Sequence, residues 1–281
     1  FFFKQKTAYE IRNCDWSSDV CSSDLPTMML EGKLAFIAGV ANKRSIAWGI
    51  AEELHRQGAT LAFTYQGERV EKNVRELAAS VGSDICVEMD ARDDASIKAA
   101  FDTAVGALGG LDLLVHSIAF AQAHDLQQRF IETKREDFWL AVDVSAYSLV
   151  AMAHEAEPHM AARGGGSIVT MTYLGGERAV PGYNVMGVAK SALDSCMRYL
   201  AADLGPANIR VNAVSAGPVR TLAGRSIPGF TVMEELVAER SPLKRNVDQG
   251  DVGKAAAYLL AAENVTGTIA YVDSGYHAMG L

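Results

Sequence analysis

The chain has 281 residues, of which 49% are hydrophobic and 21% are charged, a balance that excludes a disordered chain. Its 26 basic and 34 acidic residues give a net charge of −8, which argues against binding nucleic acid through phosphate neutralisation. The apolar runs are too short to cross a membrane, and the four cysteines include no Cys-x-x-Cys pair. We therefore expect a cytoplasmic protein with neither nucleic-acid nor membrane partners.

The first 25 residues differ in pattern from the rest of the chain. They show no persistent helical or strand periodicity, and Ser-Ser-Asp occurs twice among them. A secretory signal would place positive charge first and an apolar stretch after it, which is not the order here. We interpret residues 1–27 as a spurious or disordered extension and 28–281 as the functional domain; a genuine flexible arm is the alternative.

From Lys33 onward, apolar runs alternate with helical patterns and glycine-rich turns. Near-continuous apolar runs are typical of strands buried on both faces. The alternation predicts an α/β, Rossmann-like, doubly wound fold, with a seven-stranded parallel sheet and helices on both faces in a single domain. The expected strands are Lys33–Ala38, Thr60–Tyr65, Asp84–Met89, Leu111–His116, Ser167–Thr172, Arg210–Val214 and Thr268–Val272. The expected helices include 46–57, 136–156 and 183–205.

In such sheets, ligands bind beyond the carboxyl ends of the strands. The first strand is followed by Gly39, which can make a tight turn, and by Ser45, at the expected N-cap of a helix starting at Ile46. The Ser45 hydroxyl and the free N–H groups of the first helical turn could hold a pyrophosphate, or Ser45 could be a plain cap. We expect Gly49 to let this helix approach the sheet.

The residues that follow the second and third strands indicate which cofactor is expected to bind. Gln66 is neutral and can bond a ribose or an adenine edge, whereas Glu68 would repel a 2′-phosphate, although Arg69 adjoins it. This balance favours NADH and does not exclude NADPH. Asp90, just before Ala91, either accepts a hydrogen bond from the adenine amino group or caps the helix that follows.

Small residues follow the fourth strand in the run His116-Ser-Ile-Ala-Phe-Ala121, and they let the backbone come close to a flat cofactor. A metal role for His116 is not supported, because His124, His154 and His159 lie in no recognised ligand spacing with it. We therefore predict no metal site.

The most informative stretch follows the fifth strand. Tyr183 and Lys190 are seven residues apart, which on a helix is about two turns, so both side chains lie on one face. An ammonium group near a phenol favours the phenolate and makes the tyrosine a better proton donor; it can also hold ribose hydroxyls. After the sixth strand, Val219 and Thr221 offer groups that can meet a carboxamide, and we expect 222–240 to form a helical lid.

Together these motifs resemble the short-chain dehydrogenase/reductase superfamily, and specifically the enoyl-acyl carrier protein reductases of bacterial fatty-acid synthesis. The resemblance runs from Leu30 to Leu281. It rests on the G-x5-S-I-A-x-G turn at Gly39, HSIAFA, the Tyr173-x9-Tyr183-x6-Lys190 spacing and SAGPVRT. Ketone-reducing members of the superfamily carry Tyr-x3-Lys instead, and position 187 is glycine here. Gln122 and a short loop at 261–266 depart from the family pattern.

The resemblance implies an NADH-dependent enzyme that reduces the carbon–carbon double bond of a trans-2-enoyl-acyl carrier protein, the last step of the elongation cycle. The implied catalytic residues are Tyr183, bonding the thioester oxygen, Lys190, holding the ribose, and Tyr173, orienting the thioester. Cofactor contacts are implied for Gly39, Ser45, Ile46, Gln66, Asp90, Ala91, Ser117, Ile118, Lys190, Val219, Arg220, Thr221, Leu222 and Ala223. Substrate contacts are implied for Ala121, Tyr173, Tyr183 and Met186.

Two other functions stay open: a ketone-reducing dehydrogenase, against which the Tyr-x6-Lys spacing argues, and a non-catalytic nucleotide-sensing protein. Acyl carrier protein is the implied partner. We also expect a homotetramer, because small residues on helices 136–156 and 183–205 would let the helices of a symmetry mate approach; the alternative is that these side chains are merely solvated. The small residues are Ser145, Ser148, Ala151, Ser191 and Ser195.

Overall fold

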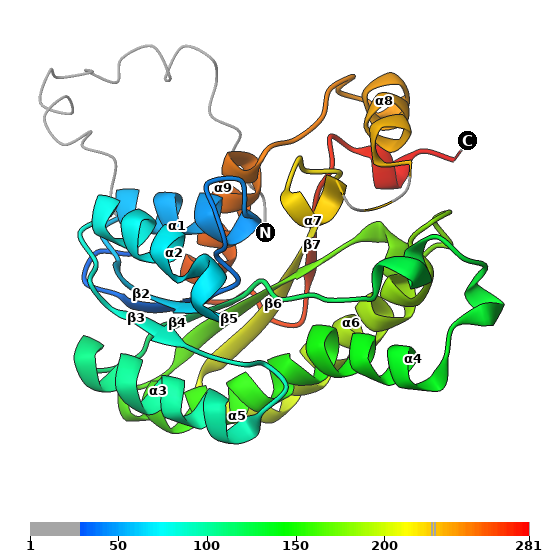
Figure 1. The fold of residues 1–281 in the computed structure, drawn as a ribbon. Helices are drawn as coiled ribbons and strands as arrows, with labels where there is room; N and C mark the ends of the chain where they lie inside the picture. Colours follow the sequence, from blue (N-terminus) through cyan, green and yellow to red (C-terminus); the bar gives the residue numbers. More distant parts are fainter. Residues whose placement is uncertain (1–28, 226, 228, 281) are drawn as a thin grey trace, which may run out of the picture.

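The computed structural model describes residues 29–225, 227 and 229–280, so the extension expected over 1–27 lies outside the described residues. Within them, seven strands form one sheet in the order β3-β2-β1-β4-β5-β6-β7, and all neighbouring strands run parallel (Figure 1). This confirms the predicted fold class. The strands are β1 (Leu34–Ala38), β2 (Thr60–Tyr65), β3 (Cys86–Glu88), β4 (Leu113–His116), β5 (Gly166–Thr172), β6 (Ile209–Ala216) and β7 (Ile269–Val272).

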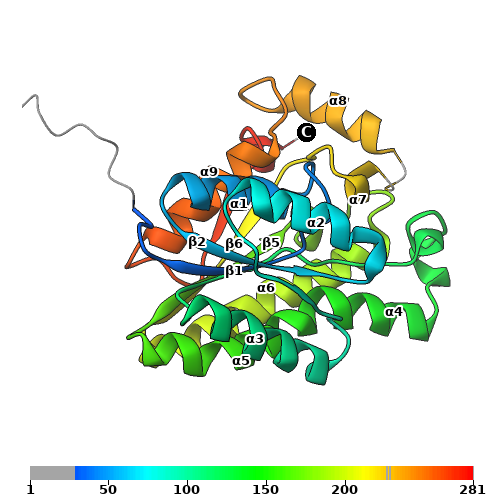
Figure 2. The same cartoon turned by 60° about the vertical axis from the view of Figure 1, so that its left-hand side comes forward.

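Helices cover both faces of the sheet, in three layers (Figures 1 and 2). The central strands are buried on both sides because their side chains alternate between two apolar clusters, one under each helical layer. One layer consists of α1 (Ile46–Arg56), α2 (Glu68–Ser80) and α9 (Gln249–Ala261). The other consists of α3 (Asp94–Leu108), α4 (Arg135–Val142), α5 (Ser148–Ala162) and α6 (Asn184–Leu204).

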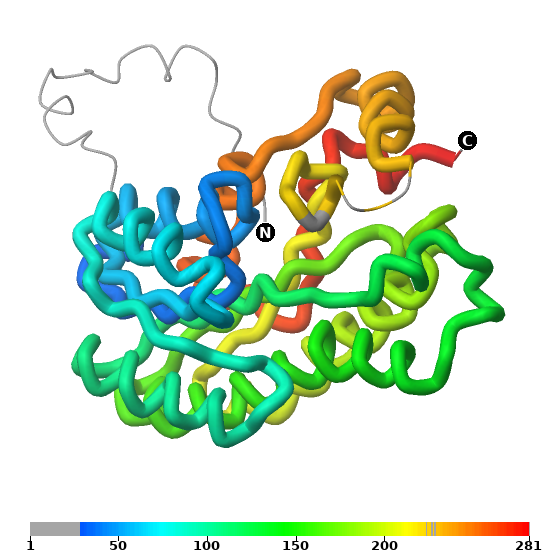
Figure 3. The backbone as a smooth tube through the Cα atoms, in the orientation of Figure 1, coloured from blue at the N-terminus to red at the C-terminus, as the bar shows by residue number. Residues whose placement is uncertain are grey.

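The strand order reverses at β1, whose neighbours β2 and β4 continue the chain in opposite directions across the sheet. A crevice forms at such a switch point, beyond the carboxyl ends of the strands. Short 3₁₀ segments complete the loops on this side: η2 (Ala123–Leu126), η3 (Phe130–Glu132), η5 (Leu174–Gly176) and η7 (Tyr276–Ala278), with η6 (Gly205–Ala207) leading into β6. Figure 3 shows the chain after β4 running outward through η2 and η3 and returning into α4.

The prediction of a single continuous helix over 136–156 is wrong in one respect. A π-helical turn at Asp143–Tyr147 separates α4 from α5. Ser145, within this turn, and Ser148, directly after it, are both fully buried. They do not face a neighbouring molecule as expected; Ser145 bonds the backbone of Phe120, and Ser148 bonds His116.

Three further expectations need correction. Residues 222–240 form two helices, α7 (Leu222–Arg225) and α8 (Phe230–Arg240), with Gly229 in a left-handed conformation before the second. Asp93, rather than Asp90, caps α3 by accepting from the Ala95 N–H. A Cβ at Gly49 would lie 2.4 Å from the Gln249 carbonyl oxygen, so this glycine lets α1 approach α9 and not the sheet. Among the described residues no helix is both long and apolar enough to span a membrane.

Candidate active site

A cavity of about 660 Å³ opens over the carboxyl ends of β1, β4, β5 and β6, at the switch point. Residues of α7 and α8, which lie on one side of the sheet's carboxyl edge in Figure 2, line part of it. Its size is in the range of small-molecule and cofactor sites. The structure brings most of the sequence-predicted site residues to its wall: Gly39, Ser45, Ile46, Gln66, Ala91, Ser117, Ile118, Ala121, Tyr173, Tyr183, Met186, Lys190, Val219, Thr221 and Leu222.

The turn after β1 lies against the end of β4. Gly39 has a φ of 108°, and a Cβ there would lie 2.1 Å from the Ser117 carbonyl oxygen, so only glycine fits. Ser45 is the N-cap of α1, as predicted, but its hydroxyl accepts from the N–H groups of Ala41 and Asn42 and shapes the loop. In the first turn of α1 the Trp48 N–H donates to the Ser45 carbonyl oxygen, which leaves the N–H groups of Ile46 and Ala47 available to an anion.

The end of β3 differs from the expectation. Ala91 lines the cavity, but the Asp90 carboxylate accepts from the Arg92 side chain and backbone N–H and lines a neighbouring pocket with Gln66. The hydrogen bond from the Arg92 side chain, which outweighs burial, lowers the pKa of Asp90. Asp90 therefore does not line the cavity. Its carboxylate pairs instead with the side chain of Arg92, two positions along the chain.

His116 is part of the sheet interior and not of the cavity. Its Nδ1 lies 2.8 Å from the Thr170 hydroxyl, and its Nε2 lies 2.8 Å from the Ser148 hydroxyl. Complete burial lowers the pKa of His116 to about 3, with a smaller contribution from the charge of Lys190. A neutral, fully bonded imidazole here is structural.

Two tyrosine rings meet in the cavity. The rings of Tyr173, just after β5, and Tyr183, at the N-cap of α6, are 4.8 Å apart between centroids and nearly perpendicular. The Tyr173 hydroxyl donates to the sulfur of Met233 in α8 at 3.0 Å. Burial raises the pKa of Tyr173 to about 12 and raises that of Tyr183 further. Both phenols are therefore protonated at neutral pH.

Lys190 reaches the cavity from α6, on the same face as Tyr183. Its side chain is buried, and its Nζ donates to the Met171 carbonyl oxygen at 2.7 Å. Burial lowers the pKa of Lys190 to about 8, although the charge of Asp194 opposes this. Burial raises the pKa of the Tyr183 phenol, and the expectation that Lys190 favours its phenolate stays a prediction.

Gly187 explains in physical terms why the Tyr-x3-Lys pattern is absent. A Cβ at this position would lie 2.6 Å from the Gly175 carbonyl oxygen, so α6 packs directly on the backbone of η5. Gly175 in turn lies against the Tyr183 ring, which a Cβ would meet at 2.4 Å. A side chain at 187 would therefore displace the turn between the two tyrosines.

We expect Gly187→Ala to lower the free energy of unfolding by about 1–3 kcal/mol, because the added methyl group overpacks a backbone contact. The activity of the site should fall with it, since the displaced turn lies between Tyr173 and Tyr183. The measurements are urea unfolding and steady-state rates. Gly106→Ala in α3, where a Cβ meets nothing within 4 Å, is the matched control and should raise stability by about 1 kcal/mol. Equal stability of the two variants would contradict this account.

Only some of the cofactor contacts implied for the residues after β6 lie at the cavity. Val219, Thr221 and Leu222 line the cavity, whereas the Arg220 side chain turns away and pairs with Glu234 of α8 at 2.7 Å. The side chain of Ala223 lies outside the described residues. Of the residues in the expected helical lid, the sequence named Leu222 and Ala223 but not Ile227, Phe230 and Met233, which also line the cavity. The helical pattern over 222–240 was the only signal for them.

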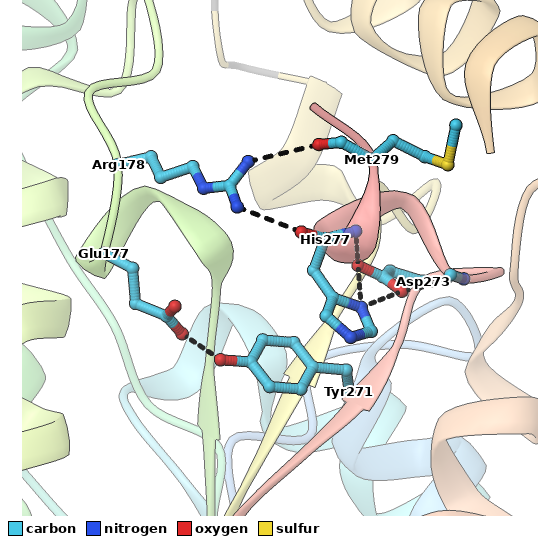
Figure 4. A network of polar contacts seen from close by, with 7 residues as sticks. Glu177, Arg178, Tyr271, Asp273, His277 and Met279 are labelled. Atoms are coloured by element: carbon cyan, nitrogen blue, oxygen red, sulfur yellow. Dashed lines mark hydrogen bonds and ion pairs between the residues drawn. The ribbon is translucent and has the colours of Figure 1, made fainter. Parts of the chain in front are cut away.

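A polar network ties the end of the chain to the segment between the two tyrosines (Figure 4). Arg178 donates to the carbonyl oxygens of His277 and Met279, and the Tyr271 hydroxyl donates to Glu177. The His277 ring stacks on Tyr271 at 3.9 Å and bonds Asp273. These contacts fix the loop that follows Tyr173, and sequence reasoning did not find them because they join positions about 100 residues apart.

The fold and the cavity together define a dinucleotide-binding site with a Tyr–Lys pair. A family model described as "Enoyl-(Acyl carrier protein) reductase" matches residues 39–277, and the chain belongs to this family. The NADPH-dependent FabI of Staphylococcus aureus is 50% identical, with 89% of this chain and 98% of that protein covered; the NADH-dependent FabI of Bacillus cereus is 48% identical, covering 90% and 99%.

Solved structures of the same family superpose closely. The enoyl-acyl carrier protein reductase of Anaplasma phagocytophilum in complex with NAD is 44% identical, with a TM-score of 0.86 over 90% of this chain and 97% of that one. The Bacillus cereus enzyme with NADP⁺ and an indole naphthyridinone is 48% identical, with a TM-score of 0.87 over 90% and 99%.

Proposed function

We propose that this chain reduces the carbon–carbon double bond of a trans-2-enoyl thioester carried by acyl carrier protein, with NADH as reductant, in the last step of fatty-acid elongation. The observation that carries the proposal is that Tyr173, Tyr183 and Lys190 line the same cavity as the glycine turn after β1. The relatives named above support the same activity. The close contact of Gly187 disfavours a ketone reductase built on Tyr-x3-Lys.

The residues present fit a nicotinamide dinucleotide. Gly39 and Ser117 both line the cavity, so a flat group can lie against the backbone there, and the first turn of α1 presents N–H groups to a pyrophosphate. Lys190 is placed to hold ribose hydroxyls, and Val219 and Thr221 to hold a carboxamide. When bound, the cofactor supplies the hydride for the β-carbon of the substrate.

We assign the residues their roles from charge and protonation. Tyr183, a protonated phenol in the cavity, donates a hydrogen bond to the thioester oxygen, where negative charge develops during reduction. Lys190 contributes a buried positive charge two helical turns away. Tyr173, held by Met233, orients the thioester, and Ala121 and Met186 complete the substrate wall.

The surface near Gln66 favours NADH over NADPH. The first turn of α2 carries Glu68 and Glu71, and a 2′-phosphate would meet their negative charge. Arg75 is already engaged by Glu71 at 2.8 Å. NADPH use stays open, because both cofactors are named among the relatives.

An absorbance assay tests the proposed function. Purified protein is expected to oxidise NADH with a crotonyl thioester and to show no turnover with an acetoacetyl thioester, with NADPH run in parallel. The physical reason is that the hydride acceptor is the β-carbon of a conjugated thioester, whose oxygen meets Tyr183. Turnover of the acetoacetyl substrate alone would favour a ketone reductase, and NADH binding without turnover of either would favour a nucleotide sensor.

We further propose a cytoplasmic homotetramer. Tyr199, 73% exposed, and the exposed Ser191 and Ser195 of α6 form one candidate face, and the half-exposed edge strand β7 forms a second. Two self-complementary faces are what a closed tetramer requires. Light scattering should give four times the chain mass of 30.1 kDa; a stable species of single-chain mass at micromolar concentration would contradict it.

A further inference from the structure

One histidine and two aspartates form a cluster outside the cavity, where η2 meets α4. His124 Nε2 lies 3.0 Å from Asp137 Oδ2 and 3.8 Å from Asp125 Oδ1. One ligand atom from each residue lies within 4.8 Å of the others. Neighbours in the sequence supply two of the three groups, and α4 brings the third, so the spacing of histidines alone could not predict this cluster.

The Asp125 carboxylate is the least satisfied member of the cluster. Its side chain is fully buried, and its Oδ1 accepts from Gln128 Nε2 at 2.8 Å. Its Oδ2 is buried without a hydrogen-bond partner among the described residues. A buried carboxylate that lacks a counter-charge is costly, and a second carboxylate beside it, Asp137, adds repulsion. A cation bound by the cluster would offset the charge of both carboxylates.

The backbone of the cluster is held in place before any ligand binds. Asn184, in a left-handed conformation directly after Tyr183, donates its amide Nδ2 to the carbonyl oxygens of Asp125 and Gln128 at 2.9 and 2.8 Å. These bonds fix η2 against the start of α6. A preformed set of donors keeps the cost of ordering a binding site low.

We propose that His124, Asp125 and Asp137 bind a divalent transition-metal ion, with Zn²⁺ as the best-suited occupant. One imidazole nitrogen and two carboxylates are three ligands typical of zinc, with water to complete the coordination. Imidazole disfavours Mg²⁺, which takes oxygen ligands in octahedral geometry. The ion cross-links η2 to α4. Since Leu126 packs on Tyr183 and Met186, it also stiffens one wall of the cavity.

The test is calorimetric titration of Zn²⁺ into full-length, tag-free protein after removal of metal with a chelator. Three variants are compared with the wild type: His124→Gln, Asp137→Asn and the control His154→Gln. The control removes another exposed histidine, on α5, with the same substitution. We expect one Zn²⁺ per chain in wild type and control, and affinity at least about tenfold lower in the two cluster variants.

Thermal melting gives a second readout. Zn²⁺ should raise the melting temperature of the wild type and the His154→Gln control but not of His124→Gln, and Mg²⁺ should raise none of them. His124 is exposed, so its replacement leaves the fold intact and decides the question even where Asp137→Asn fails to fold. Unchanged Zn²⁺ affinity in His124→Gln, or no binding in the wild type, would overturn the proposal.

Discussion

Tyr183→Phe is expected to lower kcat for an enoyl thioester by about 10²- to 10⁴-fold, the usual range for loss of a positioned proton donor. The dissociation constant for NADH should stay nearly unchanged, because the hydroxyl is proposed to meet the substrate oxygen and not the cofactor. The ring is buried, so phenylalanine keeps the contacts with Gly175 and the edge of Tyr173. Steady-state kinetics and NADH fluorescence titration measure the two quantities separately.

Tyr199→Phe is the matched control, since this tyrosine lies on the same helix but is exposed. It should retain wild-type kcat. Loss of NADH affinity in Tyr183→Phe with kcat unchanged would assign the phenol to the cofactor and overturn the proposed role.

Lys190→Met is expected to weaken NADH binding by about 10- to 100-fold, since hydrogen bonds to a charged group are worth about 1.5–3 kcal/mol. The rate should fall as well, because the same ammonium is proposed to hold the ribose and to supply positive charge near the thioester oxygen. Methionine fills a similar volume without the charge, although it leaves the Met171 carbonyl oxygen without its donor. Lys254→Met, on the exposed side of α9, is the control.

The pH profile gives the same assignment an independent test. Because burial lowers the pKa of Lys190 to about 8, the group is charged below that pH and neutral above it. The wild-type kcat/KM should therefore fall as the pH rises through about 8. In Lys190→Met this step should vanish, leaving a low rate that is flat across the same range. A step that persists in the variant would belong to another group.

The sheet was predictable from sequence because its signal is local and repeated. Each strand is a short apolar run followed by a turn, and all seven were found within two residues of their ends. The π-helical turn at Asp143–Tyr147 was not predictable, because the apolar spacing fits a continuous helix almost equally well. Within the turn, Ser145 bonds the backbone of Phe120, a contact with a distant segment that the spacing does not reveal.

The candidate site was predictable where its residues follow a local pattern. Gly39 directly follows a strand, Tyr183 and Lys190 share one face of a helix, and all three line the cavity. Asp90 and Arg220 were also predicted as cofactor contacts. In the structure, however, Asp90 forms an ion pair with Arg92, and Arg220 forms one with Glu234. Pairings of this kind depend on side-chain reach in three dimensions, which spacing along the chain does not encode.

The walls of the cavity differ in how they can change during evolution. At Gly39 in the wall, and at Gly187 behind it, backbone packs on backbone, and any added carbon collides with a carbonyl oxygen. Under α8 the boundary consists of the flexible or exchangeable side chains of Ile227, Phe230 and Met233. Single substitutions can reshape that second wall in small steps, whereas a substitution at either glycine costs stability. Divergence among proteins of this architecture should therefore accumulate at the cover, and new acyl-chain preferences should arise there first.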